Sequence, residues 1–192
     1  MWEIIIFLAT VLALIMILKK LPVDLAATDK NGDGVINEED KEKTPREVAD
    51  EHFEKGELKR AESLYLKILS KEPDDATLYN KLGLIYLQDK NFKDAKSALK
   101  QALKLEPEND TFYNNLGLLY YEMESYDDAI EAYEKSVAIN DKIPSRLVNL
   151  GLAYFMTKKY RKAADAYEQA IILDPRNEQT RELLKQAEEK LK

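Results

Sequence analysis

The chain has 192 residues with 36 acidic and 29 basic side chains, a formal net charge of −7, one histidine and no cysteine. The lack of cysteine excludes a disulfide framework, an iron–sulfur site and a thiol nucleophile, and a single histidine excludes a two-histidine metal site. The net acidity argues against a nucleic-acid-binding protein, which carries a basic excess on one face.

Residues 1–22 are dominated by an apolar run from 4 to 18, which Lys19 and Lys20 follow. A helix over residues 2–18 would be about 25 Å long, close to the lower limit of a membrane span. A cleaved signal peptide would carry basic residues before the run, and a helix in a globular core would have a polar face. We therefore expect residues 1–22 to form a hydrophobic helix that spans a membrane or joins other helices in a filament core.

Residues 23–44 form a short acidic linker that contains DKNGDGVINEED at positions 29–40. Oxygen-bearing side chains at this spacing around a central glycine are typical of a loop that binds Ca²⁺, which prefers oxygen ligands. The loop resembles an EF-hand, and more closely the shortened dockerin-type loop. The alternative is an Asx-rich turn that holds no ion. The expected ligands are Asp29, Asn31, Asp33, the carbonyl of Val35, Asn37 and Asp40.

From residue 45 to the end, small residues recur with a period of 34, for example Gly83, Gly117 and Gly151. This pattern resembles the tetratricopeptide repeat (TPR), in which each unit is a pair of antiparallel helices. The resemblance implies an all-α fold, a superhelical solenoid, in which the recurring glycine and alanine allow close helix approach. The TPR domain at 45–192 would contain four repeats at about 42–75, 76–109, 110–143 and 144–177, with a capping helix at 177–190.

The resemblance also implies a concave groove, formed by the first helix of each repeat, that binds a protein or peptide partner. Asn115 and Asn149 are 34 residues apart, so we expect their amides to form a ladder that can hydrogen-bond an extended peptide. The alternative is that the groove side chains only pack between neighbouring first helices. The expected lining is Asn80, Leu84, Leu87, Asn114, Asn115, Leu118, Tyr121, Asn149, Leu152, Phe155 and Met156.

Some TPR proteins bind C-terminal carboxylates through a basic clamp, but Lys81 is nearly the only cation at the matching positions here. Ten of the eleven tyrosines fall on recurring positions, which leaves Tyr121 alone without an expected structural role. We expect His52 to pack inside the first helix pair. No phosphate-binding or nucleophile motif occurs, so we expect no enzyme and no catalytic residue.

Two functions fit this layout. The first is a prokaryotic, non-enzymatic scaffold, anchored in a membrane by its N-terminal helix and stabilised by a calcium site, whose groove captures a partner. The alternative is a homo-oligomeric subunit of an extracellular filament, which polymerises through a pilin-like N-terminal helix and TPR–TPR contacts. Lys19 and Lys20 weakly favour a cytoplasmic C-terminal domain, whereas the calcium loop favours an extracytoplasmic one, which we expect.

Overall fold

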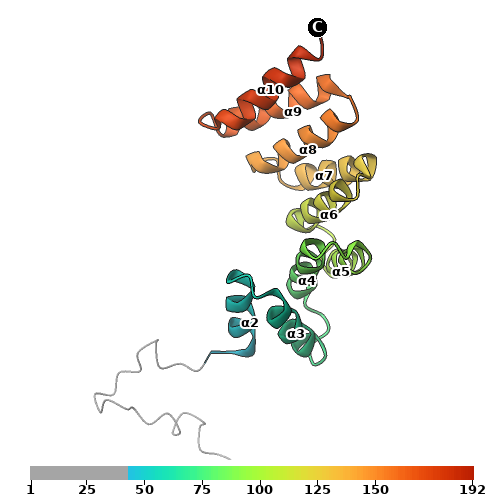
Figure 1. Ribbon diagram of the computed structural model, residues 1–192, viewed down its shortest axis with the longest axis vertical. Coiled ribbons are helices and arrows are strands. Elements are labelled where there is room, and N and C mark those ends of the chain that lie inside the picture. The colour runs from blue at the N-terminus through green and yellow to red at the C-terminus, as the bar shows by residue number, and fades with distance from the viewer. Residues whose placement is uncertain (1–42) are drawn as a thin grey trace, which may run out of the picture. The chain divides into compact units, whose positions relative to one another are not determined.

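The computed structural model describes residues 43–192, of which Thr44–Lys192 make up one unit. The expected N-terminal helix and the calcium loop lie outside the described residues. Within the unit, helix pairs stack in chain order and a single helix follows the last pair (Figure 1). The helices are α2 (Pro45–Glu54), α3 (Leu58–Leu69), α4 (Ala76–Gln88), α5 (Phe92–Leu105), α6 (Asp110–Glu122), α7 (Tyr126–Ile139), α8 (Pro144–Met156), α9 (Tyr160–Leu173) and α10 (Glu178–Glu189). For residues 43–192 the predicted fold class is therefore confirmed.

The helix starts follow from local capping chemistry. Thr44 accepts a hydrogen bond from the Glu47 backbone amide while the Glu47 side chain accepts one from the Thr44 amide, which is a capping box, and Pro45 occupies the first helical position. Asp75 and Asn109 cap α4 and α6 in the simpler way, through one side-chain oxygen. These caps satisfy backbone donors that the helix itself leaves unpaired.

Each helix pair turns through one residue in the left-handed backbone region. Gly56 has a φ of 73°, and Lys90, Glu124 and Lys158 have φ values of 56°, 58° and 61°. In each turn the next amide bonds back to the end of the first helix, as Asn91 N does to the Tyr86 carbonyl at 2.8 Å. In the three later turns this position carries a residue other than glycine. Its side chain has a steric cost in this backbone conformation that glycine would avoid.

Within each pair, the recurring glycine lets the second helix approach closely. A Cβ atom on Gly117 would lie 2.6 Å from two ring carbons of Tyr133, and one on Gly83 would lie 2.6 Å from Leu99 Cγ. The recurring alanines of the second helices, Ala61, Ala95, Ala129 and Ala163, have no exposed surface. The expected close approach is therefore confirmed.

The repeats do not pack equally well on one another. The second helix α3 packs less extensively against α4 than each later second helix packs against the first helix that follows it. At the other end, α10 packs on α9 and closes the last hydrophobic core, to which it contributes Leu183, Leu184 and the buried Ala187. The unit is therefore closed tightly at its C-terminal end and more loosely between its first two repeats.

Two aromatic expectations are corrected by the packing. The ring of Tyr121 lies edge-to-face on Tyr126 at 5.3 Å between centroids, and Phe155 with Tyr160 repeats the contact at 5.2 Å. Tyr121 therefore has a structural role, contrary to the prediction. His52 does not pack inside the first pair either, because it is half-buried at the turn, with its Nδ1 atom 2.8 Å from a Glu57 carboxylate oxygen.

Candidate peptide-binding surface

The expected groove residues lie on the first helices α4, α6 and α8. Asn80 (7% exposed), Asn115 (9%) and Leu87 (9%) are buried and offer little surface to a ligand. Met156 is 45% exposed. The remaining expected residues are half-buried: Leu84, Asn114, Leu118, Tyr121, Asn149, Leu152 and Phe155.

The asparagine side chains form hydrogen-bonded pairs between neighbouring repeats. Each pair joins residues one position out of the 34-residue register. Asn115 Nδ2 donates to Asn80 Oδ1 at 2.8 Å, and Asn149 Nδ2 donates to Asn114 Oδ1 at 3.0 Å. The residues joined are 35 positions apart, so Asn115 and Asn149 belong to two separate pairs. The amides thus connect neighbouring first helices, and only the Asn114–Asn149 pair is exposed enough to contact a ligand.

A surface hollow of about 340 Å³ lies between α8 and α10, and we call it the C-terminal hollow. It contains two of the expected groove residues, Asn149 and Leu152. Asn149 uses its Nδ2 group to donate to Asn114, and its carbonyl oxygen is a separate acceptor. Within the described residues, no donor forms a hydrogen bond with that oxygen. Every lining side chain is uncharged: Ser145, Val148, Asn149, Leu152, Asn177, Gln179, Thr180 and Leu183.

Sequence reasoning identified the α8 side of this hollow but not the α10 side. Asn177 caps α10 by accepting a hydrogen bond from the Thr180 amide at 3.0 Å, and the start of α10 lines this hollow together with α8. The signal was available, since Asn177 precedes a helical apolar pattern as an N-cap residue does. The sequence predicts only a capping role for this helix.

Lys81, a cation on the first helix α4, already forms an ion pair with Asp50. Its Nζ atom lies 2.6 Å from Asp50 Oδ1 and within 5.9 Å of the ring centres of Phe53 and Tyr65. Burial raises the pKa of Asp50, but hydrogen bonds from Lys81 and Tyr65 and the charge of Lys81 outweigh it and leave that pKa below its ordinary value. Because the Lys81 charge is already paired with Asp50, Lys81 is a poor binder of a ligand carboxylate.

Residues 43–192 contain neither a candidate metal cluster nor a candidate membrane span. No three His, Asp or Glu side chains in this range gather as a metal ion would require. In the same range, none of the helices combines the length and the apolar character needed to cross a bilayer. The predicted calcium ligands and the predicted membrane helix both lie outside the described residues, and both stay predictions.

Comparison with known families gives three matches, all to tetratricopeptide repeats. One tetratricopeptide repeat model matches residues 109–174, a TPR repeat model matches 85–124, and another tetratricopeptide repeat model matches 64–97. A comparison with curated proteins finds no significant match.

Solved structures give the same fold. A crystal structure of MamA is 27% identical with a TM-score of 0.69, and the match covers 74% of this chain and 83% of that one. A second MamA crystal structure is 26% identical with a TM-score of 0.70, covering 76% and 80% of the two chains. The first TPR domain of Spaghetti (RPAP3), bound to an HSP90 peptide, is 21% identical with a TM-score of 0.58, covering 60% and 92%. The described part of the chain is therefore a tetratricopeptide-repeat solenoid, which is the fold of a protein–protein interaction scaffold.

Proposed function

We propose that this chain is a non-enzymatic scaffold that binds an extended, uncharged segment of a partner protein in the C-terminal hollow. The observation that carries the proposal is the Asn149 side chain, whose carbonyl oxygen has capacity for a donor in a hollow of about 340 Å³. An amide at such a place can accept a hydrogen bond from a peptide N–H, while Val148, Leu152 and Leu183 contact apolar side chains.

The absence of charge in this lining determines which peptides are suited to it. A carboxylate entering the hollow would lose hydration without gaining a cation from any of the lining residues, which costs free energy. Lys81 does not supply that cation, because Asp50 holds it. The HSP90 peptide is a ligand of the RPAP3 domain.

Selection of peptides from a random display library against the purified full chain tests this function. We expect the selected peptides to be uncharged in their central positions and to bind Leu152→Lys at least tenfold more weakly. The matched control is Ile172→Lys, which also replaces an aliphatic side chain by lysine, on α9, at a side chain 76% exposed and outside the hollow. Equal loss in both variants, or unchanged binding to Asn149→Leu and Leu152→Lys alike, would refute the assignment.

We further propose that residues 2–18 anchor the scaffold in a membrane, that residues 29–40 hold a structural Ca²⁺ ion, and that the repeats lie outside the cytoplasm. The support is the sequence alone: an apolar run and a full set of calcium-loop ligands. Calorimetric titration of the full chain with Ca²⁺ tests the loop. If no heat is released and Asp29→Ala with Asp33→Ala leaves the melting temperature unchanged in Ca²⁺, the loop is only a turn.

The alternative is a subunit of an extracellular filament. Exposed apolar side chains on the last repeat and after the capping helix favour contacts between copies, chiefly Ile172 and Leu173 on α9 and Leu191 after α10. Electron microscopy of the native protein without detergent separates the two functions. Regular filaments would contradict the simple scaffold, and detergent-dependent monomers that still bind the selected peptides would contradict the filament.

A further inference from the structure

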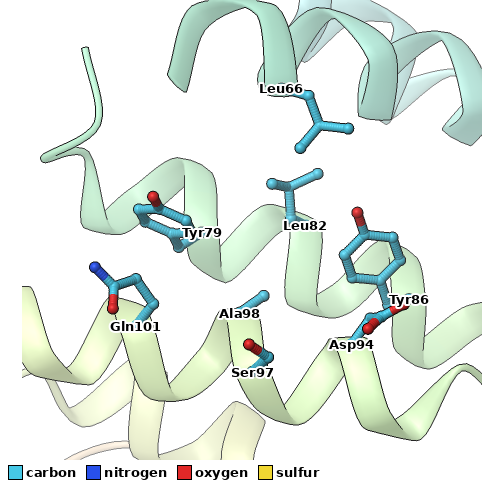
Figure 2. A pocket seen from close by; sticks show the side chains of 8 residues that line it. All are labelled: Leu66, Tyr79, Leu82, Tyr86, Asp94, Ser97, Ala98 and Gln101. Atoms are coloured by element: carbon cyan, nitrogen blue, oxygen red, sulfur yellow. The ribbon is translucent and has the colours of Figure 1, made fainter. Parts of the chain in front are cut away.

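A second hollow, of about 420 Å³, lies at the loose junction between the first two repeats, and we call it the first-junction pocket. Its floor is three side chains of α4, its upper wall in Figure 2 comes from α3 and its lower wall from α5. The residues that matter are Leu66 of α3, Tyr79, Leu82 and Tyr86 of α4, and Asp94 and Gln101 of α5.

The 34-residue register allows this pocket to be compared with the later junctions of the same chain. In those junctions every tyrosine at the matching positions lies beneath a lysine. Lys135 lies 5.8 Å from the ring centre of Tyr113, Lys96 lies 4.8 Å from that of Tyr120, and Lys162 lies 5.2 Å from that of Tyr154. Each contact is an attraction between an ammonium group and the face of an aromatic ring.

At the first junction the three lysine positions carry acidic or neutral residues instead. Glu62 stands 34 residues before Lys96, Gln101 stands 34 before Lys135, and Asp94 stands 68 before Lys162. Among the described residues, no lysine or arginine lies over the ring of Tyr79 or Tyr86. The first junction therefore keeps the aromatic rings and replaces the cations by two carboxylates and an amide.

The surroundings of Tyr86 are correspondingly acidic. Its pKa is raised, first by burial and then by the charges of Glu62 and Asp94, with a hydrogen bond to Glu62. Lys59 opposes this effect, but its ammonium group is held by Asp89 at 2.6 Å and by Glu62 at 3.3 Å. Asp94 accepts a hydrogen bond from Asn91 at 2.7 Å and makes no ion pair within the described residues.

Leu66 completes the chemistry of the pocket. It is 47% exposed, and the matching positions of the later second helices carry the charged residues Lys100, Glu134 and Glu168. An alkyl chain lying against Leu66 and Leu82 would remove apolar surface from water, which is favourable. The pocket thus offers an apolar surface, two aromatic rings and a carboxylate within one hollow.

We propose that the first-junction pocket receives a lysine side chain of a partner protein. The alkyl stem lies against Leu66 and Leu82, and the ammonium group lies against the Tyr86 ring and the Asp94 carboxylate. The site is separate from the C-terminal hollow. Tyr79, Leu82 and Tyr86 also lie on a different face of α4 from the groove residue Leu84, because a helix turns about 100° per residue. Binding here does not depend on the function proposed for the C-terminal hollow.

Nuclear magnetic resonance of the full chain with ring-labelled tyrosine tests the proposal. The probe is N-acetyl-lysine N-methylamide, and N-acetyl-norleucine N-methylamide is its uncharged counterpart. We expect the lysine probe to shift the Tyr79 and Tyr86 ring signals saturably, with a dissociation constant of the order of 1 mM. Tyr79→Phe and Tyr86→Phe assign these signals. Equal shifts with the norleucine compound, or larger shifts at Tyr113 and Tyr120, would refute the proposal.

The matched variants come from the register. Asp94→Lys places in the pocket the residue that stands at position 162, and we expect it to weaken binding of the probe at least tenfold. Asp128→Lys makes the same change in charge one repeat later and should leave binding within twofold. If Asp94→Lys loses its helical circular dichroism, Gln101→Lys replaces it. Equal effects of both aspartate variants would mean that net charge alone matters, and this would overturn the proposal. Tighter binding of spermidine than of the lysine probe would make a small polyamine the ligand, and this too would overturn the proposal.

Discussion

Removing one partner of the buried Asn80–Asn115 pair should destabilise the protein more than removing both. The two amides share a hydrogen bond of 2.8 Å and are 7% and 9% exposed. In Asn115→Leu, the Asn80 amide stays buried without its partner, whereas in Asn80→Leu with Asn115→Leu two apolar side chains of similar size face each other. The single variant therefore carries the desolvation cost and the double variant does not.

The expected loss for the single variant is ~1–3 kcal/mol of unfolding free energy, with the double variant close to wild type. A loss of 1 kcal/mol corresponds to a fall of roughly 2–4 °C in the melting temperature of a domain of this size. Asn114 and Asn149 provide the internal comparison, because they form the same bond at 3.0 Å but are half-buried. Asn114→Leu leaves Asn149 in reach of water and should lose roughly 0.5 kcal/mol or less.

Urea unfolding of the full chain, followed by circular dichroism, measures all of these variants and gives the coupling free energy of each pair. The reasoning is refuted if Asn115→Leu is as stable as wild type. It is equally refuted if the double variant loses the sum of the two single losses, because the two amides would then act independently.

Three further results are expected. Gly117→Ala should lower the unfolding free energy by ~1–3 kcal/mol, because its Cβ would lie 2.6 Å from the ring of Tyr133; a rise in the thermal midpoint would contradict this. Lys90→Gly should raise that free energy by up to ~1 kcal/mol in urea titrations, since residue 90 has a φ of 56° and glycine pays no steric cost there. Asp50 has a lowered pKa, so the stability it confers should be complete above its ordinary value of 3.8 and be lost as the pH falls through the lowered pKa. Unfolding measured at pH 7 and pH 2 should therefore differ less in Asp50→Asn, and an unchanged difference would count against the Asp50–Lys81 pair.

The period of 34 residues was enough to predict the helix pairs, because a repeated sequence must make the same contact at each repeat. Gly117 is an example, since its place beneath Tyr133 follows from the places of Gly83 and Gly151 in the same register. Periodicity does not reveal how far neighbouring helices are offset from one another. That offset explains why Asn115 meets Asn80 and not a residue of its own register.

The candidate sites were predictable only in part for the same reason. Leu152 and Asn149 were expected on the first-helix face, and the structure places both in the C-terminal hollow, but the contribution of α10 depends on how a capping helix lies on its neighbours. The first-junction pocket went unpredicted although its charge differences are visible in the sequence. Which lysine covers which tyrosine becomes known only when the distances between helices are known, as for Lys96 and Tyr120.

The loose packing of α3 on α4 has a mechanical consequence. Since each repeat contacts mainly its neighbours, a pulling force applied at α2 and α10 passes through the junctions in series. The junction between α3 and α4 should then separate first and at the lowest force, while the C-terminal hollow between α8 and α10 keeps its shape. A lysine seated between Leu66 on α3 and Asp94 on α5 would contact both sides of that junction. A partner bound there would thus raise the force at which the first repeat detaches from the rest.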